Sequence, residues 1–398
     1  MIKNLEMLTP DKIKNDLEQY WPGFEMVAYV IFNKENVFLF NHPQVESDQP
    51  YLILEWNEQF VGSTLILYKD YPTAIVDLDF HEDFESLYSL IVHELFHGYQ
   101  YLKGEKRFPD EILGLQYPTL KENVELRNME RRYLYDAVMT SSPIEKKQFL
   151  TKFINFREKR TSVMKEFIQY ENYIESVEGP AWYVELKVFD HKSSLPFENV
   201  LQKYSHNLLD KMNSSISIRI SCYASGLFIC LLMDEVSGDW QEKFLMSDKT
   251  LFDFFKEYVE YEDIQINDVP ISIETEEIID YLNSSRVEEF EQFTNKEGYH
   301  LYIEGNITSS TIDPMNIIPS ENKLLHKNYL KAIISKNEYL FQTPVISYFE
   351  GHFRNTKKLH IVLDEKPIEN NGSLLIKNVG EIKGQYSEVS EGYYLIVE

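Results

Sequence analysis

The stretch "IVHELFHGYQ", residues 91–100, constrains this chain more than any other. His93 and His97 stand four residues apart, and Glu94 directly follows the first histidine. Apolar residues recur at helical spacing from about residue 87 to residue 102, which predicts a largely apolar helix. Residues four apart lie on one helix face, so both imidazoles can reach one common partner. Such polar groups cost free energy in an apolar helix unless they have partners.

A divalent metal ion is the partner that fits this residue set best. Zinc accepts neutral histidine nitrogen, and a catalytic zinc site takes three protein ligands and keeps one position open for water. Glu94 projects from nearly the same helix face, where it can take a proton from that water. We therefore predict a Zn2+ site with His93 and His97 as ligands and Glu94 as the general base. The alternative is a pair of core histidines with ordinary hydrogen bonds, because an HExxH pattern also arises by chance.

The residues leave the third ligand open. Glu130 shares a helix face with Leu126 and Ala137, so it lies in an otherwise apolar stripe. A carboxylate in such a stripe needs a partner. That partner is either the metal ion or an arginine, for example Arg157 or Arg160.

The other candidate is Glu178, which begins the run "EGPAWY" (178–183). This run and "HELFH" (93–97) together resemble the HExxH…EG-x-A-x-Y signature of gluzincin metallopeptidases, the thermolysin- and aminopeptidase-like clan. The resemblance covers roughly residues 60–260. It implies that Glu178 binds zinc from the start of a helix, and that the small residues after it allow close approach to the HExxH helix. It favours Glu178 over Glu130 as the third ligand, with the other glutamate orienting a ligand histidine.

A later stretch extends the resemblance. Residues 218–240 look like the Y-x-x-G helix that follows EG-x-A-x-Y in related proteins. There, a tyrosine or histidine often donates a hydrogen bond to the oxyanion that develops during hydrolysis. The resemblance implies this catalytic role for Tyr223, and an ordinary core position is the alternative.

The order of the elements predicts an α+β protein. Strand signals dominate before residue 80, helical periodicity follows up to about residue 262, and short alternating runs with turn signals fill the rest. The gluzincin resemblance implies a zincin-like core, with a small mixed sheet, the HExxH helix beneath it and a helical lobe as the far wall of the cleft. The expected helices of the lobe span roughly residues 120–138, 143–172, 180–190 and 219–235. The expected parts are an N-terminal α/β part ending in the HExxH helix (1–118), a helical lobe completing the metal site (119–262) and a C-terminal mainly-β domain (263–398).

Charge and composition exclude some classes of partner. The formal net charge is −26, which argues against nucleic acid and anionic membrane surfaces because both are bound through Lys and Arg. The longest apolar stretch, residues 223–233, is too short to span a bilayer. The first residues hold no apolar signal region, and Cys222 and Cys230 fit a reducing compartment. We therefore expect a cytoplasmic protein with no membrane partner.

These observations favour a zinc-dependent hydrolase, most simply a metallopeptidase acting on a peptide or protein substrate. The alternative function is a non-catalytic binding protein with a structural or vestigial metal site, in which the C-terminal β domain contacts a partner protein. A third possibility is a metal-free helical scaffold. Metal content and an open coordination position distinguish the three, because a closed four-ligand site indicates a structural metal.

Overall fold

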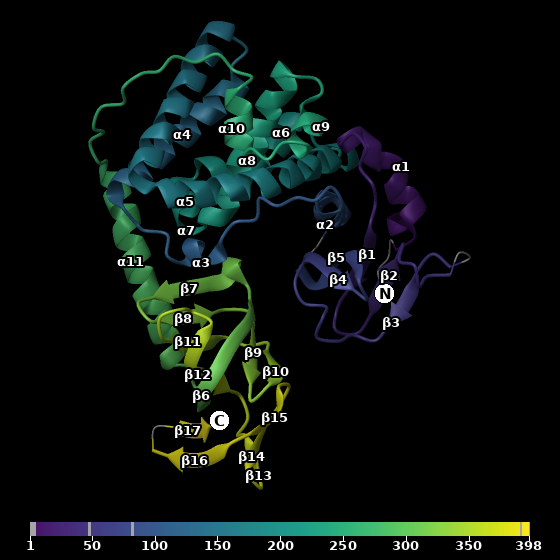
Figure 1. The fold of residues 1–398 in the computed structure, drawn as a ribbon, viewed down its shortest axis with the longest axis vertical. Coiled ribbons are helices and arrows are strands. Elements are labelled where there is room, and N and C mark those ends of the chain that lie inside the picture. Colours follow the sequence, from purple (N-terminus) through teal and green to yellow (C-terminus); the bar gives the residue numbers. More distant parts are fainter. Residues whose placement is uncertain (1–4, 47–48, 81–82, 391, 398) are drawn as a thin grey trace. The chain divides into compact units, whose positions relative to one another are not determined.

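The computed structural model describes residues 5–46, 49–80, 83–390 and 392–397 (Figure 1). The chain forms two compact units: Met1–Pro109 with Lys121–Ser272, and Asp110–Leu120 with Ile273–Glu398. The α+β class and the C-terminal β region agree with the expectation from sequence. Both parts expected before residue 262 fall mainly in the first unit.

A five-stranded mixed sheet lies in the first unit, in the order β3-β2-β1-β5-β4. Strands β1 and β5 run parallel, and the other neighbours are antiparallel. Successive side chains of β1 point to opposite faces, as the pleat of a strand requires. Tyr29 and Ile31 enter the main core, while Val30 and Phe32 enter a smaller cluster on the other face. The strands are β1 (Ala28–Phe32), β2 (Val37–Phe40), β3 (Leu52–Leu54), β4 (Thr64–Tyr68) and β5 (Tyr71–Asp77).

Helix α2 packs against β5 and β4 of this sheet and against α5 of the helical region. It begins at an N-cap, where the Asp83 carboxylate accepts a hydrogen bond from the Ser86 amide at 2.7 Å. The helices of the first unit are α1 (Pro10–Tyr20), α2 (Phe84–Leu102), α4 (Lys121–Met139), α5 (Pro143–Lys192), α6 (Phe197–Leu209), α7 (Lys211–Ile216), α8 (Ile218–Val236), α9 (Trp240–Leu245) and α10 (Leu251–Lys256). Short 3-10 helices η1 (Leu5–Leu8) and η2 (Leu78–Phe80) precede α1 and α2.

Helix α5 consists of two helical segments that meet at Met164, whereas the sequence predicted the break between residues 172 and 180. It runs from Pro143 to Lys192 and has non-helical backbone angles at Met164. The sequence suggested a helix start near Gly179 and Pro180, yet both residues lie inside α5. Gly179 is pressed against Gly226 of α8, and a Cβ on Gly179 would lie 2.6 Å from the Gly226 Cα. The glycine after the candidate ligand Glu178 therefore allows close approach of α8, not of α2 as expected.

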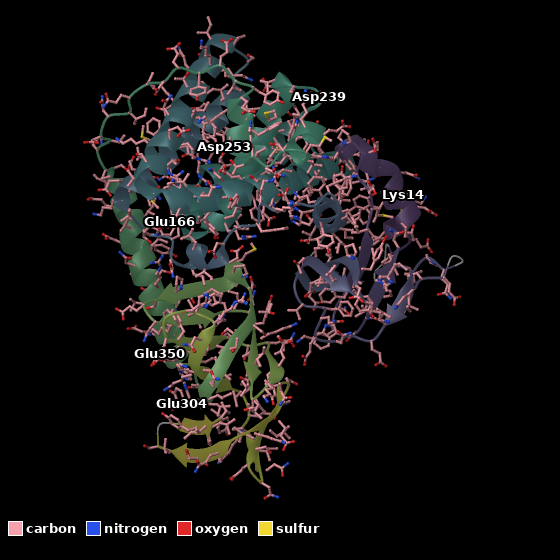
Figure 2. All side chains as sticks on the ribbon, in the orientation of Figure 1. Lys14, Glu166, Asp239, Asp253, Glu304 and Glu350 are labelled. Atoms are coloured by element: carbon pink, nitrogen blue, oxygen red, sulfur yellow. The ribbon has the colours of Figure 1, made fainter. Side chains whose placement is uncertain are left out.

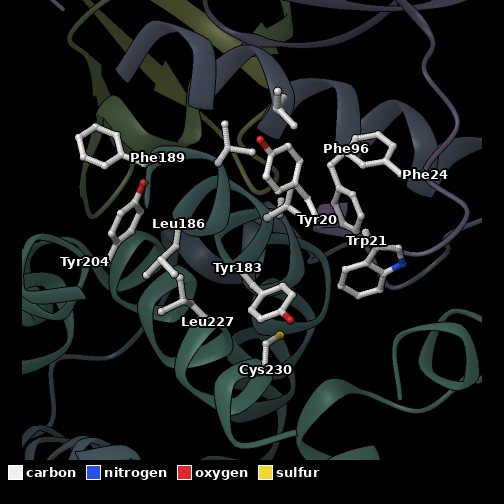
Figure 3. Close-up of a cluster of buried hydrophobic side chains, with 14 of the residues drawn as sticks. Tyr20, Trp21, Phe24, Phe96, Tyr183, Leu186, Phe189, Tyr204, Leu227 and Cys230 are labelled. Carbon is white, nitrogen blue, oxygen red and sulfur yellow. The ribbon is translucent and has the colours of Figure 1, made fainter. Parts of the chain in front are cut away.

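Aromatic rings fill the core between the sheet, α2 and α5 (Figure 3). Trp21 is fully buried, and its ring centroid lies 4.8 Å from that of Phe96 on α2. The same indole meets Tyr183 on α5 at 6.1 Å and Trp240 at 5.2 Å, both edge-on. Such aromatic pairs contribute about 0.5–1.5 kcal/mol beyond their area burial. Trp21 thus links α2 to α5 and restricts how the two helices can rotate.

The second unit is built mainly from strands. Its large sheet has the path β10-β9-β6-β12-β11-β8-β7, with β17 parallel to β6 and paired to β16. A small sheet joins β13, β14 and β15. Phe290 and Phe293 of α11 pack on the large sheet against Leu325, Ile346 and Val362. The elements are α3 (Glu111–Leu115), α11 (Ile273–Thr294), β6 (Tyr299–Ile312), η3 (Pro314–Asn316), β7 (Ile317–Ser320), β8 (Lys323–His326), β9 (Leu330–Ile334), β10 (Asn337–Phe341), β11 (Val345–Phe349), β12 (Asn355–Leu363), β13 (Ile368–Asn370), β14 (Ser373–Ile376), β15 (Gly380–Lys383), β16 (Gln385–Val389) and β17 (Gly392–Ile396).

Charged side chains cover the outside of both units (Figure 2). Asp239 and Asp253 are exposed in the first unit, and Glu350 is exposed in the second. Among the described residues, no helix is long and apolar enough to cross a lipid bilayer.

Gly226→Ala tests the contact between α5 and α8. A Cβ at Gly226 would lie 2.6 Å from the Gly179 Cα and 2.7 Å from the Glu175 carbonyl oxygen. Because backbone atoms cannot rotate away as a side chain can, we expect the free energy of unfolding to fall by at least about 1–3 kcal/mol. Gly238→Ala is the matched control, since a Cβ there meets nothing within 4 Å. Urea denaturation measures both variants, and equal losses in the two would contradict the expectation.

Candidate metal centre

Three potential metal ligands from two helices meet in the first unit. His93 and His97 lie on α2, Glu178 lies on α5, and one ligand atom from each falls within 4.8 Å of the other two. The two Nε2 atoms are 3.0 Å apart. Glu178 Oε2 lies 3.2 Å from His97 Nε2 and 3.7 Å from His93 Nε2. Two imidazole nitrogens and a carboxylate oxygen thus face one common point, which is the donor set of a three-ligand zinc site.

The other nitrogen of each imidazole faces an oxygen. His93 Nδ1 lies 2.9 Å from Glu185 Oε2, and His97 Nδ1 donates to Gln100 Oε1 at 2.8 Å. The Gln100 amide in turn donates to a backbone carbonyl of α5 at 2.8 Å. Such oxygens fix the ring orientation and the tautomer, and they leave Nε2 free to bind a metal. A hydrogen bond to Gln100 therefore holds the His97 imidazole in a metal-binding orientation, while the Glu185 carboxylate lies close to His93 Nδ1 without making a hydrogen bond to it.

Glu178 uses its two oxygens differently. Oε2 faces the histidines, while Oε1 accepts a hydrogen bond from Arg219 Nη2 at 3.0 Å. Burial raises the pKa of Glu178, but attraction to His97 and then to Arg219 outweighs burial and lowers the pKa to about 2. Burial likewise lowers the pKa of His97, but Glu178 overcomes this and raises that pKa to about 9. Without a metal, His97 therefore carries a proton, which metal binding must displace.

Glu94 lies beside these ligands with one oxygen unused. Its side chain is buried, and its Oε2 has no hydrogen-bond partner among the residues that the structure describes. Burial raises the pKa of Glu94, and the charges of His93 and His97 partly offset that effect. A buried carboxylate with an unpaired oxygen is costly unless it has a further partner. A water molecule held at the common point of the three ligands would be such a partner.

Tyr223 is connected to the same carboxylate through Arg219. Arg219 Nε lies 3.2 Å from the Tyr223 hydroxyl, while Nη2 of the same guanidinium binds Glu178. Trp182 packs perpendicular to the Tyr223 ring, with 5.5 Å between ring centroids. Burial and the neighbouring Glu178 raise the pKa of Tyr223, so its hydroxyl stays protonated and able to donate a hydrogen bond. The structure places Tyr223 near the metal ligands, and its role toward an oxyanion stays a prediction.

Glu130 does not join the three ligands. It is fully buried on α4, where Arg157 Nε donates to its Oε1 at 2.8 Å and Arg160 Nη1 donates to its Oε2 at 2.6 Å. Burial raises the pKa of Glu130, but the two arginines outweigh burial and lower it. The interpretation of Glu130 as a metal ligand was therefore wrong. Its apolar stripe did indicate a buried carboxylate with a partner, and that partner is a pair of arginines.

Glu130 belongs to a buried ion-pair network beneath the ligands. Arg157 binds Glu175 through two parallel hydrogen bonds of 2.8 Å, and Arg160 binds Glu171. Glu171 and Glu175 precede Glu178 by two turns and one turn on α5, so all three lie on neighbouring parts of one face. The network therefore fixes the segment of α5 that carries the ligand. Its members are Arg127, Arg131, Arg157, Arg160, Glu130, Glu171 and Glu175.

A second set of potential ligands, Glu171, Glu175 and Cys222, lies inside this network. Both carboxylates are already bound by arginines, whose charges would repel a cation. Burial raises the pKa of the Cys222 thiol to about 11, so the thiolate that binds metals is not formed near neutral pH. This set is therefore part of the structural network and not a metal site.

Comparisons of this chain with models of protein families, with curated proteins and with solved structures find no match. The interpretation of the site therefore depends on the geometry of its side chains. Sequence reasoning missed Gln100 and Glu185. Both had a positional signal, because Gln100 follows His97 by three residues on one helix and Glu185 follows Glu178 by two helical turns.

Acid should unfold the first unit through its buried carboxylates. Folding lowers the pKa of Glu130, Glu171 and Glu178. A lowered pKa contributes stability that is complete above the unfolded value of about 4.3 and is lost as the pH falls through the folded value. We expect the free energy of unfolding to drop steadily from about pH 5 to pH 2, by about 1.4 kcal/mol for each unit of pKa shift. Urea titrations at several pH values measure it, and a flat profile below pH 5 would contradict the network.

Proposed function

We propose that this protein is a zinc-dependent hydrolase of the gluzincin type, with a zincin-like core, acting on peptide bonds. The observation that carries the proposal is the convergence of His93, His97 and Glu178 beside the unpaired carboxylate oxygen of Glu94. Bound zinc would supply Lewis-acid polarisation and would lower the pKa of a coordinated water toward about 7. The residues present fit zinc, because two imidazoles and one carboxylate are a donor set of catalytic zinc sites.

Each side chain has a separate task in this proposal. Glu94 accepts the proton of the attacking water and later delivers it to the leaving amine, as a general base and acid does. Burial raises its pKa, which brings it closer to the working pH and favours this exchange. Gln100 holds the His97 imidazole in place through a hydrogen bond, and the Glu185 carboxylate lies 2.9 Å from His93 Nδ1. Tyr223, protonated and next to Arg219, offers a hydroxyl donor for a developing oxyanion.

The second candidate, a non-catalytic binding protein with a structural metal, is less well supported. A structural zinc site is closed by four protein ligands. Within the described residues, the group around His93 and His97 contains a single carboxylate ligand, Glu178. A buried acid with an unpaired oxygen next to the ligands is also unexplained in a purely structural site. Both observations favour catalysis.

Glu94→Gln separates catalysis from metal binding. Glutamine keeps the shape of the side chain but cannot accept a proton, so we expect zinc affinity to change little and hydrolysis to fall by at least about 10²-fold. The measurements are zinc titration and mass spectrometry of a mixed peptide library incubated with the zinc-loaded protein. His97→Ala is the companion variant and should lose both properties. Undiminished cleavage in Glu94→Gln would overturn the mechanism, and zinc-loaded wild type that binds peptides without cleaving them would favour the second candidate.

Glu178→Gln and Glu130→Gln separate the two carboxylates that compete in sequence. Glu178→Gln should weaken zinc binding by more than about 10²-fold, because it removes a charged ligand and not only an orienting group. Glu130→Gln should leave zinc affinity nearly unchanged but destabilise the fold by about 3–5 kcal/mol, because two buried arginines each lose one of their two anionic partners. Zinc competition titrations and urea denaturation of both variants measure this. If Glu130→Gln lost zinc at full stability, the assignment of Glu178 would fail.

A further inference from the structure

A cavity of about 1050 Å³ lies in the second unit. Its walls come from residues 112–119, from the last half of α11, from the turn between β7 and β8, and from the segment after β11. Every one of these residues belongs to the second unit, so the cavity is formed without the candidate metal centre. Its volume lies just above the range of roughly 300–1,000 Å³ that small-molecule sites occupy. The cavity can therefore hold a ligand of several residues or of drug size.

Two cationic side chains line this cavity without a carboxylate partner. The Arg286 guanidinium donates to the Thr119 hydroxyl at 3.2 Å, and the Lys323 ammonium lies 4.4 Å from the centre of the Phe290 ring. Among the described residues, no carboxylate lies within 4.0 Å of either cation. Phe290 follows Arg286 by four residues on α11, so the two cations lie toward one side of the cavity.

Unpaired cations are unexpected at such a place in this chain. Asp and Glu number 65 against 39 Lys and Arg, so carboxylates are available to neutralise most surface cations. Arg286 is only partly exposed, and burial lowers the pKa of its guanidinium with no opposing effect from an anion. A buried charge that lacks a counter-ion costs free energy, which an anionic ligand would recover. The planar guanidinium matches a carboxylate through two parallel hydrogen bonds.

The other residues that line the cavity restrict the chemical class of the ligand further. Glu291 and Glu321 also line the cavity, so a phosphate with two negative charges would meet stronger repulsion than a carboxylate with one. Ile112 and Phe353 provide apolar contacts. Side-chain amides and hydroxyls, such as Asn283, offer both donors and acceptors. A fatty acid would bury those polar groups without partners, whereas the amides of a peptide would satisfy them.

We propose that this cavity binds the C-terminal end of a peptide whose last side chain is hydrophobic. The α-carboxylate pairs with Arg286 and Lys323, the final side chain contacts the apolar wall near Phe353, and the preceding amides bond to the polar lining. This site is independent of the metal centre, and it stands whether or not the first unit cleaves peptides.

The test uses the whole chain and matched probes. An N-acetylated tetrapeptide ending in leucine with a free carboxylate is titrated calorimetrically, alongside the same peptide as its C-terminal amide, dodecanoate and inorganic phosphate. We expect saturable binding of the peptide acid and at least tenfold weaker binding of the amide. Arg286→Gln and Lys323→Gln should each weaken the acid by about tenfold without affecting the amide. Lys383→Gln, which removes an exposed cation of β15, is the control and should change neither.

Three controls accompany the titrations. Circular dichroism and thermal unfolding show that each variant remains folded, and Thr119→Val removes the hydrogen bond to Arg286 while keeping the charge. Mass spectrometry after the titration shows that the probe was not cleaved. The proposal is overturned if the acid and the amide bind equally, if the variants bind the acid as wild type does, or if dodecanoate or phosphate binds more tightly than the peptide acid.

Discussion

The buried ion-pair network is the constraint on which the first unit depends. It places four arginines and three glutamates in the interior between α4, α5 and α8. Taking such charges out of water costs several kcal/mol per ion, and their attraction offsets that cost only when geometry and hydrogen bonds are complete. A shift of the α5 segment before Met164 by one residue would separate Arg157 from Glu130 on α4 and also from Glu175 on the segment after Met164. Because these buried charges tolerate a single arrangement, they fix the register between the two segments of α5 more than they add net stability. That register determines the position of Glu178.

The network and the glycine contact act on the same segment. Ser225 of α8 donates a hydrogen bond to Glu175, and the next residue, Gly226, touches Gly179 on the neighbouring turn. A polar contact therefore fixes how α8 slides along α5, and a backbone contact fixes how close it comes. Arg219 lies two turns earlier on α8 and reaches Glu178 from there. The buried ion-pair network and the contacts with α8 together thus determine the position of the ligand carboxylate.

Sequence reasoning succeeded where the information is local and failed where it depends on distant partners. The spacing of His93 and His97 on one helix is a local property, and the structure brings their Nε2 atoms together. The apolar stripe around Glu130 correctly indicated a buried carboxylate, but its partners lie 27 and 30 residues away, and no local pattern chooses between an arginine and a metal. Helices α6 and α7 were not expected, although Val200, Leu201, Tyr204 and Leu208 recur at helical spacing in α6 and are buried there.

The excess negative charge around the three ligands is the strongest physical reason to expect a divalent cation at the candidate metal centre. Glu94, Glu178 and Glu185 surround the two histidines, while Arg219 is the guanidinium paired there with Glu178. With neutral imidazoles, three carboxylates and one guanidinium leave two negative charges in a largely buried space, a state that low dielectric penalises. Without a metal, the protein relieves this excess through protons, which is why the pKa of His97 rises to about 9 and that of Glu94 rises as well. A divalent cation removes the same excess at once and leaves both imidazoles neutral, as ligand histidines must be. The raised pKa values and the proposed zinc site therefore have one cause. The fixed charges of the pocket sum to two negative charges, which equal and oppose the charge of a divalent cation.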